Sequence, residues 1–228
     1  MAGRRTYDDP CGIARALDMV GERWALLVVR ELLLGPKRFA ALHRGLAGMS
    51  QNVLSQRLRD LEQAGVVRHR TLGPPASARV YELTPRGLDL EPVLFALARW
   101  GSRSPLDVTP TAELSVDAMM LALRTTFDPT AASGLTARLA LRFEDDLFAA
   151  EIDSERFHVA RAEQPPHADA TLTTDVTTFR TLVFGGRPPA EPMRSGELHL
   201  DGDTTLATRF LTCFRRPPTT PAPVADSI

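Results

Sequence analysis

The chain has 228 residues, 43% hydrophobic and 24% charged, which suits a globular protein of two domains. Residues 1–105 carry a net charge of +6 and residues 106–228 one of −7, so we expect a basic and an acidic domain with different partners. The longest apolar run near the start, residues 24–29, excludes a membrane span of about 20 residues there, and residues 1–9 lack the apolar stretch of a signal peptide. We therefore expect a cytoplasmic protein without a membrane partner.

Short helical segments separated by turn residues make up the beginning of the chain. Residues 13–20 and 24–34 are predicted to be helices, the second ended by a Gly-Pro pair, and residues 39–43 a third, short helix. A longer helix is predicted to begin after Ser50, which has the character of an N-cap, and to end before Gly65.

The helix that follows Ser50 has two distinct faces. Leu54, Leu58 and Leu61 are spaced by four and three residues, so they form one apolar stripe. The opposite face carries amide, hydroxyl and guanidinium groups, which hydrogen-bond base edges in a major groove. An ordinary amphipathic surface helix would show the same pattern, so the neighbouring segments must decide. The residues of this helix predicted to contact DNA are Ser50, Gln51, Asn52, Ser55, Gln56 and Arg59.

The segments after this helix favour a winged helix-turn-helix. Residues 66–72 and 78–83 are predicted to be two strands joined by a turn with Gly73-Pro74-Pro75. Three helices followed by such a ribbon form a winged domain, in which the second helix of the motif enters the major groove. A further helix is predicted from Pro85, capped by Thr84, to Trp100, and we expect its apolar face to pack against a second subunit.

Basic residues are concentrated in this region. Eight lysines and arginines lie between positions 37 and 79, against two acidic residues, which favours a polyanionic partner. The residues predicted to bind phosphate are Lys37, Arg38, Arg44 and Arg79.

Residues 8–101 resemble the HxlR family of winged helix regulators. The matching segments, in order, are Cys11-Gly12-Ile13, Ala16-Leu17, Gly21-Glu22-Arg23-Trp24, residues 35–39, residues 50–65, residues 66–70, Pro74-Pro75, residues 81–87 and Trp100-Gly101. The resemblance implies a homodimer, formed by the first and last helices of the domain, that binds double-stranded DNA with two-fold symmetry. Cys11 lies where the family carries a cysteine that some members use as a thiol sensor, and is a candidate redox sensor here; Cys213 is expected in a core.

The second half predicts a separate α+β domain, residues 112–216, after a linker of residues 102–111 and before a flexible tail of residues 217–228. Its predicted helices are residues 116–127, 176–184 and 203–214, and its predicted strands residues 137–143, 147–153, 156–162, 170–174 and 197–201.

This domain resembles the sterol-carrier-protein-type fold in three short stretches, Asp169 to Leu172, Gly185-Gly186 and Gly196 to Asp203. The resemblance implies an apolar tunnel between sheet and helices, which would take a small apolar or aromatic ligand. Plain core packing is the competing interpretation for each lining residue. The candidate lining residues are Met119, Met120, Phe143, Phe148, Phe157, Phe179, Phe184 and Phe210.

No catalytic site is predicted. His158, His167 and His199 lack metal-ligand spacing, residues 144–146 suit a turn between strands, and neither a nucleophile elbow nor a phosphate loop occurs. We expect neither metal nor cofactor. The hypothesis is a ligand-responsive, sequence-specific transcriptional regulator. Two alternatives stay open: an apolar-ligand carrier or enzyme whose winged domain only dimerises, and a thiol-based sensor that acts through Cys11.

Overall fold

The computed structural model describes residues 6–73, 78–103, 114–153, 155–216 and 218. The chain divides into two compact units, Met1–Leu94 and Phe95–Ile228. The predicted linker lies outside the described residues from position 104 onward, and so does the predicted tail apart from residue 218. None of the helices in the described ranges is both long and apolar enough to cross a membrane.

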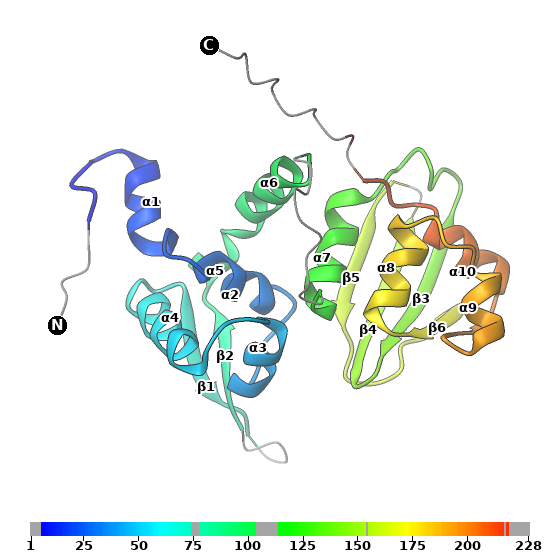
Figure 1. Ribbon diagram of the computed structural model, residues 1–228, viewed down its shortest axis with the longest axis horizontal. Helices are drawn as coiled ribbons and strands as arrows, with labels where there is room; N and C mark the ends of the chain where they lie inside the picture. The colour runs from blue at the N-terminus through cyan, green and yellow to red at the C-terminus, as the bar shows by residue number, and fades with distance from the viewer. Residues whose placement is uncertain (1–5, 74–77, 104–113, 154, 217, 219–228) are drawn as a thin grey trace, which may run out of the picture. The chain divides into compact units, whose positions relative to one another are not determined.

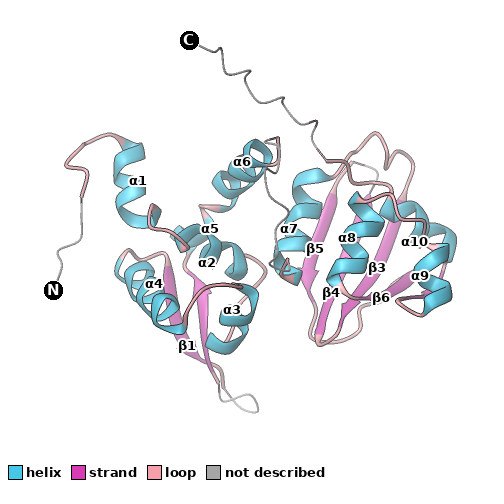
Figure 2. Ribbon diagram, in the orientation of Figure 1, coloured by secondary structure: helices cyan, strands magenta, loops and turns pink. Residues whose placement is uncertain are grey.

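The N-terminal part of the chain is a winged helix-turn-helix, as predicted (Figures 1 and 2). The two strands of the wing are antiparallel and place His69 opposite Tyr81. Lys37 adds an isolated β-bridge to Tyr81 from the turn before α3. The elements are α1 (Gly12–Val20), α2 (Ala25–Leu32), α3 (Phe39–Gly45), α4 (Gln51–Gln63), β1 (Val67–Thr71), β2 (Arg79–Leu83), α5 (Pro85–Leu88) and α6 (Glu91–Gly101).

The cap and the apolar stripe predicted for α4 are both confirmed. The Ser50 hydroxyl accepts a hydrogen bond from the amide of Val53 at 3.3 Å, which satisfies one of the free amides of the first turn. Leu54, Leu58 and Leu61 are 0%, 1% and 0% exposed. Each buried leucine contributes roughly 2 kcal/mol to the stability of the domain, so the stripe fixes which face of α4 points outward.

The prediction of a single helix from Pro85 to Trp100 was wrong, because two helices occupy this stretch. Thr84 does cap α5, accepting a hydrogen bond from the amide of Gly87 at 3.1 Å. However, α5 ends at Leu88 and α6 begins at Glu91. Pro92 accounts for the break, since a proline lacks the amide hydrogen that a continuous helix needs and restricts the residue before it.

The C-terminal unit is an α+β domain, as predicted, and its five strands form one sheet. The strand order is β5-β4-β3-β6-β7, in which β3 and β6 are parallel and the other neighbours antiparallel. Figure 1 shows α7, α8 and α10 on the same side of this sheet. The elements are α7 (Val116–Thr126), β3 (Thr136–Phe143), β4 (Asp146–Asp153), β5 (Phe157–Arg161), β6 (Ala170–Thr174), α8 (Val176–Phe184), α9 (Ala190–Ser195), β7 (Leu198–Gly202) and α10 (Thr204–Leu211).

Alternating residues of β3 form the centre of this domain's core. Leu139, Leu141 and Phe143 are at most 2% exposed, and they share one face of the strand. Helix α9 was not predicted, because it has only six residues and contains Pro192, so it shows neither helical periodicity nor high helix propensity. The turn predicted at residues 144–146 is confirmed at Glu144 and Asp145.

Candidate nucleic-acid interface

The outward face of α4 presents the polar side chains that the sequence singled out. Gln51, Asn52, Gln56 and Arg59 are exposed, and Ser55 is half-buried. They lie opposite the buried leucines, so the helix offers a row of hydrogen-bonding groups to solvent. Ser50 is exposed as well, but its hydroxyl oxygen is engaged in capping the helix.

Gln56 and Arg59 are joined in one hydrogen-bonded network with Asp60. The Gln56 amide donates through Nε2 to Oδ1 of Asp60 at 2.7 Å. Its other atom, Oε1, accepts from Nη2 of Arg59 at 2.8 Å. Because a carboxylate only accepts and a guanidinium only donates, these partners fix which way the Gln56 amide points.

Arg57 anchors this network to the rest of the domain. Its Nη1 lies 3.1 Å from Oδ2 of Asp60 and 3.7 Å from Oε2 of Glu22 in the turn between α1 and α2. The Arg57 side chain is 14% exposed, whereas that of Glu22 is 73% exposed. Asp60 therefore contacts the partly buried Arg57 through one oxygen and Gln56 through the other. Sequence reasoning missed Arg57 and Asp60, although spacings of three and four residues on a helix indicate such pairs.

The structure argues against the phosphate contact predicted for Lys37. Its side chain is only 10% exposed, and Nζ lies 2.9 Å from Oε2 of Glu31, which is completely buried. Arg30 donates to the other oxygen, Oε1, through Nη2 at 2.9 Å. Gly45 leaves room for this carboxylate, because any β-carbon there would collide with it. The Lys37 ammonium group therefore balances the charge of the buried Glu31 carboxylate instead of facing solvent.

The other predicted phosphate contacts are at the surface. Arg38 precedes α3, Arg44 lies in its last turn and Arg79 begins β2, and all three are exposed. Two further arginines, Arg68 and Arg70, project from β1, but Glu82 binds both, at 2.8 and 2.9 Å. The wing therefore carries a basic surface that one glutamate partly neutralises.

The end of α4 is tied to the wing by a hydrogen bond. Oε1 of Glu62 lies 2.5 Å from Nδ1 of His69 in β1. Opposite His69, Tyr81 has its pKa raised by burial and by the charge of Glu62. These contacts join the helix that carries the candidate base-contacting residues to the two-stranded ribbon.

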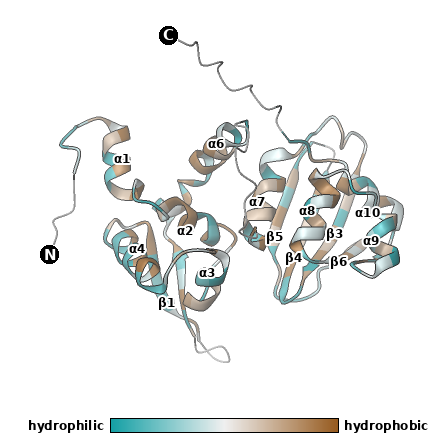
Figure 3. Ribbon diagram, in the orientation of Figure 1, coloured by the Kyte–Doolittle hydropathy of each residue, from teal (hydrophilic) through white to brown (hydrophobic). Residues whose placement is uncertain are grey.

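The helices α1 and α6 expose a large amount of apolar surface. On α1, Ile13 and Leu17 are 73% and 42% exposed. On α6, none of whose residues is buried, Val93, Leu97 and Trp100 are 53%, 46% and 71% exposed. Figure 3 shows apolar colouring along both helices. Exposed apolar side chains of this size are frequent in surfaces that bind other proteins.

The two cysteines lie in different surroundings. Cys11 is exposed at the N-cap position of α1. Cys213 is buried, as predicted, and burial raises the pKa of its thiol. The described ranges hold no group of three or more histidine, cysteine or acidic residues that could bind a metal ion.

The residues predicted to line a ligand tunnel pack against one another in two aromatic groups. Phe143 lies 5.2 Å from Phe179 and 6.4 Å from Phe148, measured between ring centroids. Phe157 lies 6.1 Å from Phe210 and 5.1 Å from Phe214, a residue the sequence analysis did not include. Met119 and Met120 are fully buried, whereas Phe157 and Phe184 are half-buried. Such contacts are those of a packed core.

A charged cluster borders the first of these aromatic groups. Asp117 in α7 is 2% exposed, and both of its oxygens accept from Nη2 of Arg161, at 3.0 and 2.8 Å. Nη1 of Arg161 bonds to Asp146, and its guanidinium lies 4.7 Å from the centre of the Phe148 ring. The two carboxylates raise the pKa of Arg161 against the effect of its burial.

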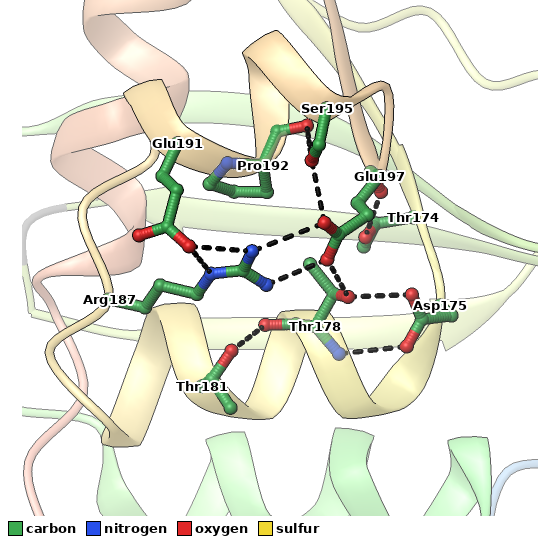
Figure 4. A network of polar contacts seen from close by, with 9 residues as sticks. All are labelled: Thr174, Asp175, Thr178, Thr181, Arg187, Glu191, Pro192, Ser195 and Glu197. Atoms are coloured by element: carbon green, nitrogen blue, oxygen red, sulfur yellow. Dashed lines mark hydrogen bonds and ion pairs between the residues drawn. The ribbon is translucent and has the colours of Figure 1, made fainter.

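The glycine-rich stretches that resemble a sterol-carrier domain flank a polar network between α8, α9 and β7 (Figure 4). Arg187 bonds to Glu197 at 2.8 Å and to Glu191 at 3.0 Å. Ser195 donates to Glu197 at 2.6 Å, and Thr178 lies 3.4 Å from it. Arg187 and Ser195 lower the pKa of Glu197 to about 2. This network ties neighbouring elements together.

Comparison with known proteins assigns the N-terminal part to a family of regulators. Residues 19–106 match the family model described as HxlR-like helix-turn-helix. An uncharacterized HTH-type transcriptional regulator of Synechocystis sp. is 40% identical over 93 residues, 40% of this chain and 68% of that relative. The HTH-type transcriptional regulator YodB of Bacillus subtilis is 32% identical over 88 residues, 39% of this chain and 79% of YodB.

The C-terminal part matches a different description from the one that its sequence suggested. Residues 108–220 match the family model described as alkyl sulfatase C-terminal. The solved structure of the sec-alkylsulfatase Pisa1 from Pseudomonas sp. is 20% identical, with a TM-score of 0.41, and the match covers 50% of this chain and 19% of that one. The sterol-carrier resemblance stays a prediction.

Proposed function

The chain belongs to the family of HxlR-like helix-turn-helix transcriptional regulators, and we propose that it binds palindromic operator DNA as a homodimer in response to a small apolar ligand. The observation that carries the proposal is the outward face of α4. Its exposed Asn52, Gln56 and Arg59 match the donors and acceptors of base edges, while three buried leucines hold the helix to the core.

Phosphate contacts would orient the protein on the duplex. Arg38, Arg44 and Arg79 are exposed around α3 and the wing, on the domain whose sequence is basic. Contacts of this kind position a protein without specifying sequence, whereas contacts from α4 would specify it.

The exposed apolar side chains of α1 and those of α6 support a dimer. Ile13, Leu97 and Trp100 are each at least 46% exposed, and covering them in a two-fold interface would remove this area from water. A two-fold dimer carries two copies of α4, which supports a palindromic operator with half-sites about one helical turn apart.

The C-terminal unit is proposed to be the sensing part. Its two aromatic groups supply an apolar interior, and we assign to it binding and no catalysis. A ligand shifts the equilibrium between two forms only if it binds them with different affinities, so the effector must favour one spacing of the two α4 helices. A change of a few ångströms would then mismatch the half-sites.

A gel-shift assay on the DNA upstream of the protein's own gene tests the proposal. We expect a discrete complex that forms at lower protein concentration than with random DNA and weakens steeply as salt increases. Equal affinity for both duplexes would reject sequence-specific regulation.

The match to the alkyl sulfatase C-terminal model supports a second candidate, an apolar-ligand carrier or enzyme whose winged domain only dimerises. Decyl sulfate and decanol are suitable probes, because they share an alkyl chain and differ in the sulfate. Binding of both without any operator, or release of sulfate from the first, would favour this candidate over the regulator.

Cys11 supports a third candidate, a thiol-based sensor. The thiol is exposed at the start of α1, one of the two helices proposed to form the dimer. In that case an electrophile such as a quinone releases the operator from the wild-type protein and not from Cys11→Ser. If the electrophile releases the operator from both proteins, the switch does not depend on the Cys11 thiol.

A further inference from the structure

We propose that Asp60 is a positioning residue that sets the sequence specificity of α4, although its charge repels DNA. The inference rests on the proposed function and concerns the same helix. Asp60 lies at the edge of the outward face and contacts Gln56 and Arg57 through different carboxylate oxygens.

The first step of the argument is the orientation of the Gln56 amide. A free glutamine on a helix surface presents its donor and acceptor interchangeably, since the amide can rotate by half a turn. Here Nε2 faces Asp60 at 2.7 Å and Oε1 faces Arg59 at 2.8 Å. The reversed amide would set an oxygen against the carboxylate and a donor against the guanidinium, so one orientation is selected.

The second step is what this orientation leaves free. The Gln56 NH2 group has two N–H donors and its carbonyl oxygen has two lone pairs. Asp60 accepts from one N–H and Arg59 donates to one lone pair, so one donor and one acceptor remain. A donor and an acceptor side by side complement N7 and the N6 amino group of adenine. Arg59 keeps further N–H groups beyond the one bonded to Gln56, and these complement O6 and N7 of guanine.

The third step is the support of Asp60 itself. Its side chain is 29% exposed, so it would move freely without a second contact. Arg57, whose side chain is 14% exposed, has its Nη1 3.1 Å from Oδ2 of Asp60 and 3.7 Å from Oε2 of Glu22 in the turn between α1 and α2. The order of contacts is therefore Glu22, Arg57, Asp60, Gln56 and Arg59, which connects the α1–α2 turn to the groups proposed to contact bases.

Charge alone and positioning predict opposite effects of removing Asp60. Deleting a negative charge beside a polyanion raises affinity for every duplex. If Asp60 positions Gln56 and Arg59, the same deletion lowers affinity for the preferred duplex relative to random DNA. The ratio of the two affinities separates these effects, and a general loss of folding would lower both together.

The experiment selects duplexes from a randomised pool with the full-length protein and then measures affinity for the enriched duplex and for random DNA. For Asp60→Ala we expect unchanged or tighter binding to random DNA and a loss of about tenfold in the affinity ratio, the magnitude of one bidentate base contact. Glu62→Gln is the matched control, since it removes a charge from the same helix but its hydrogen bond goes to His69. The control should keep the ratio.

A double-mutant cycle with Gln56→Ala completes the test. If Asp60 acts through Gln56, the loss of specificity in the double variant equals that of Gln56→Ala alone. An Asp60→Ala protein that enriches the same duplex with the wild-type ratio overturns the positioning role while leaving the regulator proposal intact. A wild-type protein that enriches no sequence overturns the proposed function and this inference with it. Urea unfolding of each variant identifies a loss that comes from folding.

Discussion

Lys37 and Glu31 form an ion pair of 2.9 Å inside the winged domain, where Glu31 is fully buried. The main chain of the same lysine exchanges two hydrogen bonds with Tyr81 of β2, at 2.9 and 2.8 Å. One residue therefore links α2, through its side chain, to the wing, through its backbone. Helix α3 begins two residues later, so this link also fixes where the helix-turn-helix starts relative to the ribbon.

Replacing Lys37 by methionine should destabilise the winged domain by about 3 kcal/mol, because it removes the ammonium group that lies 2.9 Å from the buried Glu31 carboxylate. Urea unfolding measures the change. The control is Arg38→Ala at the neighbouring, exposed position, which should change stability by less than about 0.5 kcal/mol. If Lys37→Met keeps its stability and binds DNA more weakly, the phosphate contact predicted from the sequence is correct and the structural role of Lys37 is not.

Alanine at Arg38, Arg44 or Arg79 should weaken binding to selected and random duplexes by the same factor. Each exposed guanidinium is proposed to neutralise about one phosphate, so the slope of log affinity against log salt should fall by roughly one in each variant. Fluorescence anisotropy over a salt series gives both quantities. The control is Arg156→Ala, an exposed arginine of the acidic unit, which should leave both quantities unchanged. If the Arg38, Arg44 or Arg79 variant keeps the wild-type slope, that arginine does not contact phosphate.

Glutamate at Leu97 should convert the proposed dimer into a monomer, since it would place a charge among the exposed apolar side chains of α6. Sedimentation velocity measures the oligomeric state, and operator affinity should fall because only one α4 remains. Met193→Glu is the control, since Met193 is 42% exposed on α9. A Leu97→Glu protein that stays dimeric would place the interface on another surface.

The C-terminal unit should lose stability in acid through Glu197. Its pKa is about 2 in the folded protein against an ordinary 4.5, mainly because Arg187 donates hydrogen bonds to it. A carboxylate with a lowered pKa contributes stability above pH 4.5 that is progressively lost as the pH falls toward 2. Thermal unfolding between these values should show the decline in the wild type and a flatter profile in Glu197→Gln. Identical profiles would mean that the network contributes no pH dependence.

Sequence predicted most of the winged domain because its signals are local. The N-cap at Ser50, the leucine stripe of α4 and the two strands β1 and β2 all depend on residues within a few positions of one another. The turn predicted between these strands lies outside the described residues at positions 74–77. The outward face of α4 followed from the same periodicity, and the structure places Asn52, Gln56 and Arg59 there.

The contacts that sequence did not predict join distant or unexpected residues. Glu31 lies within a mainly apolar helix, and nothing in the sequence shows that Lys37 turns inward to meet it. The pairing of Arg57 with Glu22 depends on how α4 packs against the turn between α1 and α2. In the C-terminal unit, the alternating pattern predicted the strands, but the order β5-β4-β3-β6-β7 comes from long-range pairing. Whether aromatic residues such as Phe143 enclose a ligand or only one another also depends on three-dimensional packing.

The most direct test of the account is the affinity of Arg59→Ala for a duplex selected by the wild-type protein, compared with its affinity for random DNA. We predict that the wild type prefers the selected duplex by at least about a thousandfold. The variant should lose roughly tenfold or more of that preference while its affinity for random DNA changes little beyond the effect of one lost charge. An Arg59→Ala protein with the full wild-type preference would show that the outward face of α4 does not contact bases.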